Sequence, residues 1–367
     1  MTIQGNAETD RRESLLQVLE AAEEKAKAIP MKGQPLLVFG TGNTTELYQN
    51  AFAAEHLQVA AYTDNNKAKW GTQYHGIDVI PPTEIKERYP DAAVIICVGS
   101  YGAGVAITQQ LDEMGLSSLL VDAYIFGLHK NEILACFDAL DDETSRDVYS
   151  TLITKRMRNI PVDAFERNQY FALNEFAGAK PGEVFVDAGA YTGDSVERYL
   201  WEREGVFGKI YAFEPYTPNL ASMEHRFRRL MDEWNIPTSK IVVEHAGIGD
   251  TSAMMDVCVQ GGDNAGYGAN LSTGDAVETI PVHALDDYFA DQSIGFLKAD
   301  IESMELAALR GAVNVIKRDH PRLAICIYHN ASDMYQIQTY LMQLGVGYHF
   351  AIRHHSPTYS ETVLYAW

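Results

Sequence analysis

Residues 184–200 read VFVDAGAYTGDSVERYL, and this stretch decides the fold. An apolar run ends at Asp187, glycines follow at Gly189 and Gly193, and a helical pattern begins directly after them. This order predicts a buried strand, a tight turn and a helix whose N-terminus offers unpaired N–H groups to an anion. Glycine also lets the backbone of such a turn approach a ligand closely. The stretch therefore predicts a ligand site at the carboxyl end of a strand.

The spacing of the glycines distinguishes between two kinds of ligand that could bind this turn. A dinucleotide fingerprint needs G-x-G-x-x-G and no acid facing the pyrophosphate, whereas this turn has G-x-x-x-G directly after Asp187. Asp187 suits a zwitterionic amino acid that carries a sulfonium, because the carboxylate attracts the ammonium and the cationic sulfur. The helix end would then take the carboxylate of the ligand.

Two further strand ends supply contacts to the same ligand. Glu214, in AFEP, is placed to accept hydrogen bonds from ribose hydroxyls, and Gly247 and Ile248, in HAGIGD, can frame an adenine edge. The predicted cofactor-binding residues are Asp187, Gly189, Ala190, Tyr191, Gly193, Glu214, Pro215, Gly247, Ile248 and Asp300.

Composition excludes several classes of partner. The 367 residues are 46% hydrophobic and 22% charged, which is typical of a globular chain, and the length favours two domains. A formal net charge of −21 argues against nucleic acid and against an anionic membrane surface. We find no apolar run of transmembrane length and no signal peptide, and the four cysteines form no CxxC. These features predict a cytoplasmic protein.

The alternation of strand and helix patterns divides the chain into four parts. They are a helical arm (1–32), a Rossmann-like α/β domain (33–125), a helical connector (126–178) and a second α/β domain (179–367). Residues 165–176 of the connector, FERNQYFALNEF, are expected to form a short helix. In the second domain, a Gly-rich loop at 261–275 is a candidate lid over the site.

The C-terminus indicates how the second sheet closes. GYHFAIRHH (347–355) and ETVLYAW (361–367) are too close in sequence for a crossover helix, so they are expected to pair as a hairpin. The predicted fold class is therefore α/β, with two Rossmann-like domains. The second has the class I methyltransferase sheet, which is parallel except for an antiparallel C-terminal strand.

The second domain resembles the FkbM family of methyltransferases. The residues that carry the resemblance are VFVDAGAYTGDS, IYAFEP, VHALDDYF, FLKADIESMELAALRGA, LAICIYHNASDMYQI and ETVLYAW. The family usually reads Asp-x-Glu-Gly after the fourth strand, and Ser303 stands here in place of that glycine. The resemblance implies S-adenosylmethionine as cofactor and O-methylation of a sugar, glycan or secondary metabolite.

Three side chains at strand ends are candidates for the chemistry. KADIE places Asp300 and Glu302 at the tip of the fourth strand, and CIYHN places His329 at the tip of its neighbour. Methylating an alcohol needs a group that removes the hydroxyl proton, and a neutral histidine suits this near pH 7. Asp300 would orient the acceptor or contact the methionine ammonium. The three could instead hold Mg²⁺, which prefers oxygen ligands, or serve the fold alone.

The first α/β domain carries a partial nucleotide fingerprint. Gly40 and Gly42 are followed by Thr45 where a third glycine would stand, and Asp64 lies near the spacing of a ribose-binding acid. A nucleotide site, a vestigial site and a surface for homodimerisation or substrate presentation all fit this pattern. Two alternatives to a methyltransferase follow: an NAD(P)- or nucleotide-sugar-binding enzyme that uses this domain, and a non-catalytic protein that keeps the fold.

Overall fold

The computed structural model describes residues 2–30, 33–259, 269–270 and 275–367. The candidate lid at 261–275 therefore lies almost wholly outside the described residues. The chain forms two compact units. One comprises Met1–Ala164, Asn330–Tyr335 and Pro357–Tyr359, and the other comprises Phe165–His329, Gln336–Ser356 and Ser360–Trp367. Within the described ranges, no helix has both the length and the apolar composition needed to span a membrane.

The first unit is built on a six-stranded sheet in the order β3-β4-β2-β1-β5-β6. The strands are β1 (Leu36–Phe39), β2 (Val59–Thr63), β3 (Gln73–Tyr74), β4 (Ile77–Ile80), β5 (Ala93–Ile96) and β6 (Ser117–Leu120). All neighbouring pairs are parallel except β3 and β4, which form a hairpin that the sequence analysis did not predict. The fully buried residues of β1 and β5 explain their unbroken apolar sequences.

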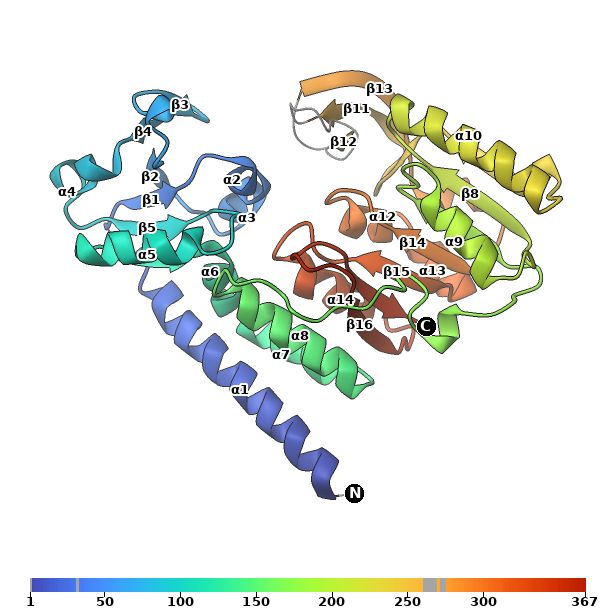
Figure 1. Ribbon diagram of the computed structural model, residues 1–367, viewed down its shortest axis with the longest axis horizontal. Coiled ribbons are helices and arrows are strands. Elements are labelled where there is room, and N and C mark those ends of the chain that lie inside the picture. Colours follow the sequence, from blue (N-terminus) through green and yellow to red (C-terminus); the bar gives the residue numbers. More distant parts are fainter. Residues whose placement is uncertain (1, 31–32, 260–268, 271–274) are drawn as a thin grey trace. The chain divides into compact units, whose positions relative to one another are not determined.

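The described residues of the first unit also form eight α-helices. They are α1 (Thr2–Lys27), α2 (Asn43–Leu47), α3 (Gln49–Ala54), α4 (Ile85–Arg88), α5 (Ala103–Glu113), α6 (Val121–Leu128), α7 (Lys130–Asp138) and α8 (Glu143–Arg156). Helix α1 packs against α6, α7 and α8 (Figure 1). Leu15, Leu19, Ala22 and Ala26 form an apolar stripe along α1 and are buried, as in an amphipathic helix.

The second unit contains a seven-stranded sheet in the order β16-β17-β15-β14-β7-β8-β9. The strands are β7 (Val184–Ala188), β8 (Lys209–Phe213), β9 (Ile241–Glu244), β14 (Phe296–Ala299), β15 (Arg322–Cys326), β16 (Phe350–His354) and β17 (Thr362–Ala366). Only β17 runs against its neighbours, and it lies between β15 and β16. This order confirms the predicted sheet and its antiparallel closing strand.

Helices and a second, smaller sheet complete this unit. The helices are α9 (Asp194–Glu202), α10 (Thr217–Glu233), α11 (Leu285–Tyr288), α12 (Glu305–Arg310) and α13 (Val313–Asp319). Helix α14 (Asp333–Gln343) belongs to this unit from Gln336 onward. The smaller sheet joins β10 (Gly247–Ile248), β11 (Ala253–Val259), β12 (Ala269–Asn270) and β13 (Asp275–His283). Its main pair, β11 and β13, is antiparallel.

The helix expected at 165–176 is absent. Within this range the structure has one short 3₁₀ turn, Asn174–Phe176, and otherwise irregular backbone. The N–H of Glu166 donates to the carbonyl of His354 at 2.7 Å, and the ring of His355 contacts the carbonyl of Glu166 at 2.9 Å. The backbone of this segment thus pairs with the C-terminal hairpin instead of bonding within a helix.

Candidate functional site

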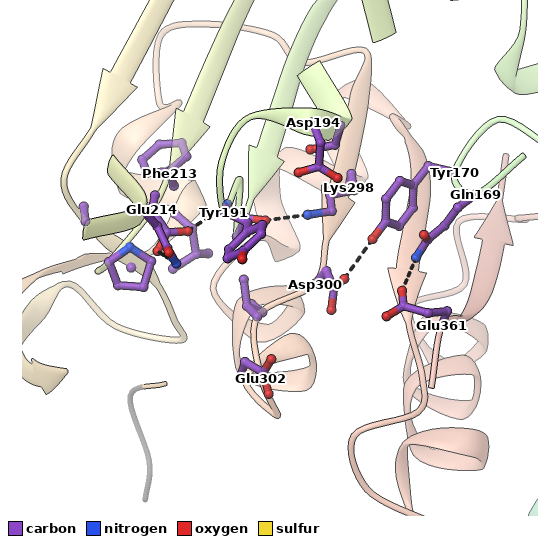
Figure 2. Close-up of a pocket in the computed structure, with 18 of the residues that line it drawn as sticks. Gln169, Tyr170, Tyr191, Asp194, Phe213, Glu214, Lys298, Asp300, Glu302 and Glu361 are labelled. Carbon is purple, nitrogen blue, oxygen red and sulfur yellow. Dashed lines mark hydrogen bonds between the residues drawn. The ribbon is translucent and has the colours of Figure 1, made fainter. Parts of the chain in front are cut away.

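A cavity of about 310 Å³ lies at the carboxyl ends of β7, β8 and β14 in the second unit (Figure 2). This is the edge of an open α/β sheet at which ligands bind. Eight of the predicted site residues line the cavity: Gly189, Tyr191, Glu214, Pro215, Gly247, Ile248, Asp300 and Glu302. Four others, Asp187, Ala190, Gly193 and His329, are not among the lining residues. The sequence pattern thus brings two-thirds of the predicted site residues to one cavity. The chemical roles of all twelve residues remain predictions.

Asp187 is placed differently from the prediction. Its side chain is fully buried, where one carboxylate oxygen lies 3.1 Å from Nζ of Lys298 and the other accepts a short hydrogen bond from Ser195. Burial alone would lower the pKa of Lys298, but attraction to Asp187 outweighs burial and raises that pKa above its ordinary value. Asp187 is therefore engaged by Lys298 and Ser195, and its predicted contact with a ligand's ammonium stays a prediction.

The turn after β7 needs glycine at two positions, because neighbouring atoms lie too close to the backbone there for a side chain. Gly189 has φ +73°, and a Cβ atom built on it would lie 1.9 Å from the backbone oxygen of Asp300. Gly193 has φ +81°, and a Cβ there would lie 2.6 Å from the ring of Phe227. Both positions combine a left-handed backbone with no room for a side chain. The turn can thus pass directly over the end of β14, which brings Asp300 and the N-terminus of α9 to the same cavity.

Glu214 lies at the end of β8, where protein N–H groups hold it in place. Its carboxylate accepts hydrogen bonds from the backbone of Tyr191 at 2.8 Å and of Tyr216 at 3.0 Å, and from the amide of Asn219 at 3.1 Å. Burial nevertheless raises the pKa of Glu214 to about 7. Because a carboxylate has about four lone-pair sites, these three donors leave about one for a ligand hydroxyl.

Asp300 is held as a carboxylate at the centre of the cavity. Tyr170 donates to one of its oxygens at 2.8 Å and Tyr328 to the other at 3.0 Å. Burial would raise the pKa of Asp300. The positive charges of Lys298 and His329, with the two phenol donors, outweigh burial and lower the pKa. Asp300 therefore keeps a fixed negative charge at neutral pH.

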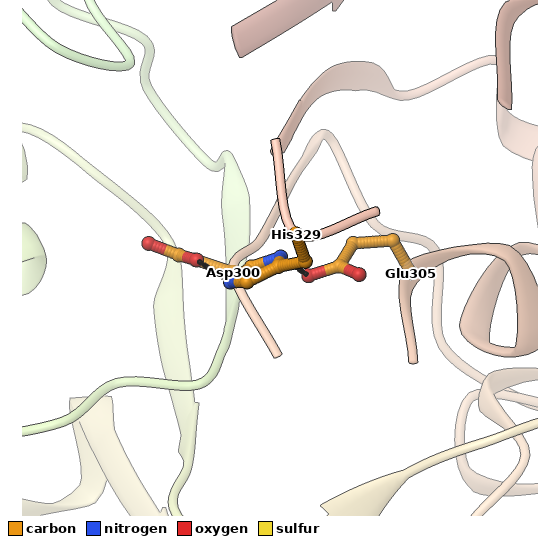
Figure 3. A group of neighbouring side chains, drawn as sticks. All are labelled: Asp300, Glu305 and His329. Carbon is orange, nitrogen blue, oxygen red and sulfur yellow. Dashed lines mark ion pairs between the residues drawn. The ribbon is translucent and has the colours of Figure 1, made fainter. Parts of the chain in front are cut away.

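His329 lies behind Asp300, between two carboxylates (Figure 3). Its Nδ1 is 3.1 Å from Glu305 and its Nε2 is 3.4 Å from Asp300, and only 5% of its side chain is exposed. Burial alone would lower the pKa of His329, but Glu305 and Asp300 outweigh burial and raise it to about 10. His329 is then an imidazolium at neutral pH, which disfavours the role of base predicted for it.

Glu302 has the properties that His329 lacks. Its side chain lines the cavity and is 42% exposed, so a ligand can reach it. Desolvation of its carboxyl group within the cavity and the nearby carboxylates Asp300 and Glu305 raise the pKa of Glu302 to about 7, although His329 opposes this. A carboxyl group with a pKa near 7 is suited to accept a proton at neutral pH.

The carboxylates around His329 do not form a site that suits Mg²⁺. The sequence predicted Asp300, Glu302 and His329 as the possible Mg²⁺ ligands. The structure instead brings together Asp300, Glu305 and His329, which each offer one ligand atom within 4.8 Å of the others. However, the two ring nitrogens of His329 face different carboxylates, Nδ1 facing Glu305 and Nε2 facing Asp300. Mg²⁺ also prefers carboxylates and water to imidazole. The magnesium alternative thus gains no support, and the mechanism below uses no metal.

The turn after β14 is strained at two successive residues. Glu302 has φ +52° and Ser303 has φ +79°, the left-handed region that favours glycine. Replacing Ser303 with glycine is expected to stabilise the protein by about 1 kcal/mol, because a non-glycine residue costs about 1–2 kcal/mol there. Thermal or urea unfolding measures the gain. Ser303→Ala is the matched control and should give none, and a glycine variant no more stable than the wild type contradicts the assignment of strain.

Several residues of the site carried no recognisable signal in the sequence. Gln169 and Tyr170 belong to the irregular segment before β7, and Glu361 lies just before β17. Asp194, the first residue of α9, and Lys298, inside β14, also line the cavity. The register of the sheet is the one signal that could have indicated a partner, because Lys298 pairs across the strands with Asp187.

In the first unit, residues of the partial nucleotide fingerprint contact other protein groups. Asp64, the candidate ribose acid, accepts from the hydroxyl of Thr41 at 2.8 Å and from Nζ of Lys69 at 2.8 Å. A Cβ on Gly40 would lie 2.2 Å from the carbonyl oxygen of Cys97, so this glycine is explained by the packing of β1 against the end of β5. This arrangement favours a scaffold over a nucleotide site.

Comparison with protein families gives two matches. Residues 33–120 match the family described as C2185-like, N-terminal. Residues 187–351 match the methyltransferase FkbM domain. No curated protein matches the chain.

A solved methyltransferase structure shares the fold of this chain. Methyltransferase FkbM from Methylobacillus flagellatus KT is 21% identical and matches over 98% of this chain and 100% of its own, with a TM-score of 0.57. An rRNA methylase from Streptococcus thermophilus is 14% identical and covers 51% of this chain and 87% of its own, with a TM-score of 0.31. From the family match, residues 187–351 of this chain form a methyltransferase domain of the FkbM family.

Proposed function

We propose that the protein transfers the methyl group of S-adenosylmethionine to a hydroxyl of a sugar, glycan or secondary metabolite. The observation that carries the proposal is the carboxyl groups that line the cavity: Asp194, Glu214, Asp300, Glu302 and Glu361. Such a lining attracts a sulfonium and an ammonium and repels a pyrophosphate. Asp194, the first residue of α9, also places a negative charge where a dinucleotide would need to dock its phosphates.

The residues of the cavity suit each part of this cofactor. Glu214 can accept a ribose hydroxyl, Gly247 and Ile248 can frame the adenine, and Asp300 can attract the ammonium. When bound, S-adenosylmethionine supplies a methyl carbon that the acceptor oxygen attacks in line while the carbon–sulfur bond breaks and its electron pair stays on sulfur. The turn at Gly189 lies over the end of β14, so cofactor and Asp300 would meet on one side of the cavity.

Glu302 is assigned as the base that takes the acceptor's proton. Its carboxylate is reachable from the cavity, and its pKa of about 7 makes it partly deprotonated at neutral pH. His329 acts on this base from behind. Its positive charge, 3.7 Å from Glu302, favours the deprotonated form. Both residues thus keep a part in the chemistry, but their parts differ from those predicted from the sequence.

Binding experiments separate this proposal from the two alternatives. Isothermal titration calorimetry with S-adenosylmethionine, S-adenosylhomocysteine and NAD⁺ should show binding of the first two and not of the third. Binding of NAD⁺ instead would favour the oxidoreductase alternative. Failure of all three to bind would favour a non-catalytic protein.

A Glu214→Gln variant tests the cofactor's position. The substitution removes a charged acceptor, which contributes about 1.5–3 kcal/mol to a hydrogen bond, so affinity for S-adenosylhomocysteine should fall about ten- to a hundredfold. Glu224→Gln, an exposed residue of α10, is the matched control and should keep wild-type affinity. Equal affinities of the two variants would place the ribose elsewhere.

A further inference from the structure

One wall of the cavity is built from residues outside the family-matched domain. Gln169 precedes residues 187–351 and Glu361 follows them, yet both line the cavity, and the Gln169 amide donates a short hydrogen bond to the Glu361 carboxylate. Their neighbour Tyr170 donates to Asp300 at 2.8 Å, which ties this wall to the centre of the site. We call Gln169 and Glu361 the outer pair.

The outer pair lies away from the residues assigned to the cofactor. Figure 2 shows Glu214 and Tyr191 on one side of the view and the outer pair on the other, with Asp300 and Lys298 between them. A cofactor that contacts Glu214 and the Gly189 turn would thus leave the outer pair to the second substrate. The wall is also firmly placed, because backbone bonds at Glu166 hold its segment to the C-terminal hairpin.

The charge of the cavity restricts what the outer pair can bind. Five lining residues carry carboxyl groups, and Lys298 carries the one positive charge among the described lining residues. The Lys298 ammonium is already engaged by Asp187 at 3.1 Å and by the carbonyl of Gly189 at 2.6 Å. A negatively charged substrate would therefore meet like charges and find no unengaged cation in this lining.

We propose that Gln169 and Glu361 bind the methyl acceptor and select an uncharged or positively charged polyhydroxyl compound over an anionic one. This inference rests on the proposed function. A carboxylate beside an amide offers acceptors and donors to neighbouring hydroxyl or amino groups. Burial and the Asp300 carboxylate also raise the pKa of Glu361, so a further negative charge there would be unfavourable.

Three probes of equal size and different charge test the inference. Glucose, glucosamine and glucuronate are titrated at pH 7.5 into the complex of the full chain with S-adenosylhomocysteine. We expect glucose and glucosamine to bind, and glucuronate to bind at least tenfold more weakly than either. Glucuronate binding as tightly as glucosamine, or binding of none of the three, overturns the proposal.

Charge variants locate the selection in the outer pair. In the complex saturated with S-adenosylhomocysteine, Glu361→Gln should reduce the preference for glucosamine over glucuronate at least tenfold. Gln169→Lys should shift the ratio of the affinities for glucosamine and glucuronate in the same direction, and it replaces Glu361→Gln if that variant does not fold. Glu224→Gln is the control and should leave this ratio unchanged. An unchanged ratio in both outer-pair variants refutes the inference alone, whereas failure of the wild type to bind S-adenosylhomocysteine refutes the proposed function.

Discussion

Replacing Glu302 with glutamine is expected to lower kcat for methyl transfer by about 10²–10⁴-fold, the usual contribution of a general base. The amide keeps the shape of the side chain but cannot take the acceptor's proton. Affinity for S-adenosylhomocysteine should change little, because Glu302 is assigned to the proton rather than to the cofactor. The measurement is transfer of a labelled methyl group to the acceptor that gives the highest wild-type turnover.

The pH dependence gives the same assignment an independent readout. A base must be deprotonated to act, so wild-type kcat should rise with pH through about 7, the pKa of Glu302, and level off above it. Glu302→Gln should lose this rise. His329→Gln should move it to higher pH, because removing the positive charge near Glu302 raises the pKa of that carboxyl. A Glu302→Gln variant that keeps more than about a tenth of kcat excludes this residue as the base.

The sequence predicted the position of the site better than its inner contacts. Gly189, Glu214 and Asp300 could be placed together because each follows a strand, and the carboxyl ends of parallel strands share one edge of a sheet. The pattern of strand and helix also predicted the sheet and its antiparallel closing strand, since two strands so close in sequence can pair only as a hairpin.

Contacts between distant segments could not be read in this way. Glu305 precedes His329 by 24 positions in sequence, and only the folded chain shows that its carboxylate lies 3.1 Å from the ring, where it raises the pKa of His329. Gln169 belongs to a segment expected to be helical, and its place in the cavity depends on bonds to the C-terminal hairpin. Periodicity reports which face of an element is buried, but it does not report which side chains meet across elements.

Replacing Asp187 with alanine is expected to destabilise the second unit by about 3–5 kcal/mol, because the substitution leaves a buried ammonium without its partner. The Lys298 side chain is 4% exposed and lies 3.1 Å from Asp187, in the register position directly opposite it on β14. Lys298 also donates to the carbonyl of Gly189, so loss of the pair should disturb the turn and weaken cofactor binding indirectly. Hydrogen exchange of amides in β7 and β14 during urea titration measures the loss for this unit alone, since a two-unit chain need not unfold in one step.

A double variant distinguishes this explanation from direct contact between Asp187 and the cofactor. Replacing both members of a buried ion pair with apolar residues is often neutral, whereas removing one member is costly. Asp187→Ala combined with Lys298→Met should therefore recover most of the stability lost in Asp187→Ala alone. Stability losses that simply add would show that the two residues act independently. An Asp187→Ala protein of wild-type stability that no longer binds S-adenosylhomocysteine would instead return Asp187 to the ligand-contacting role first inferred from VFVDAGAYTGDS.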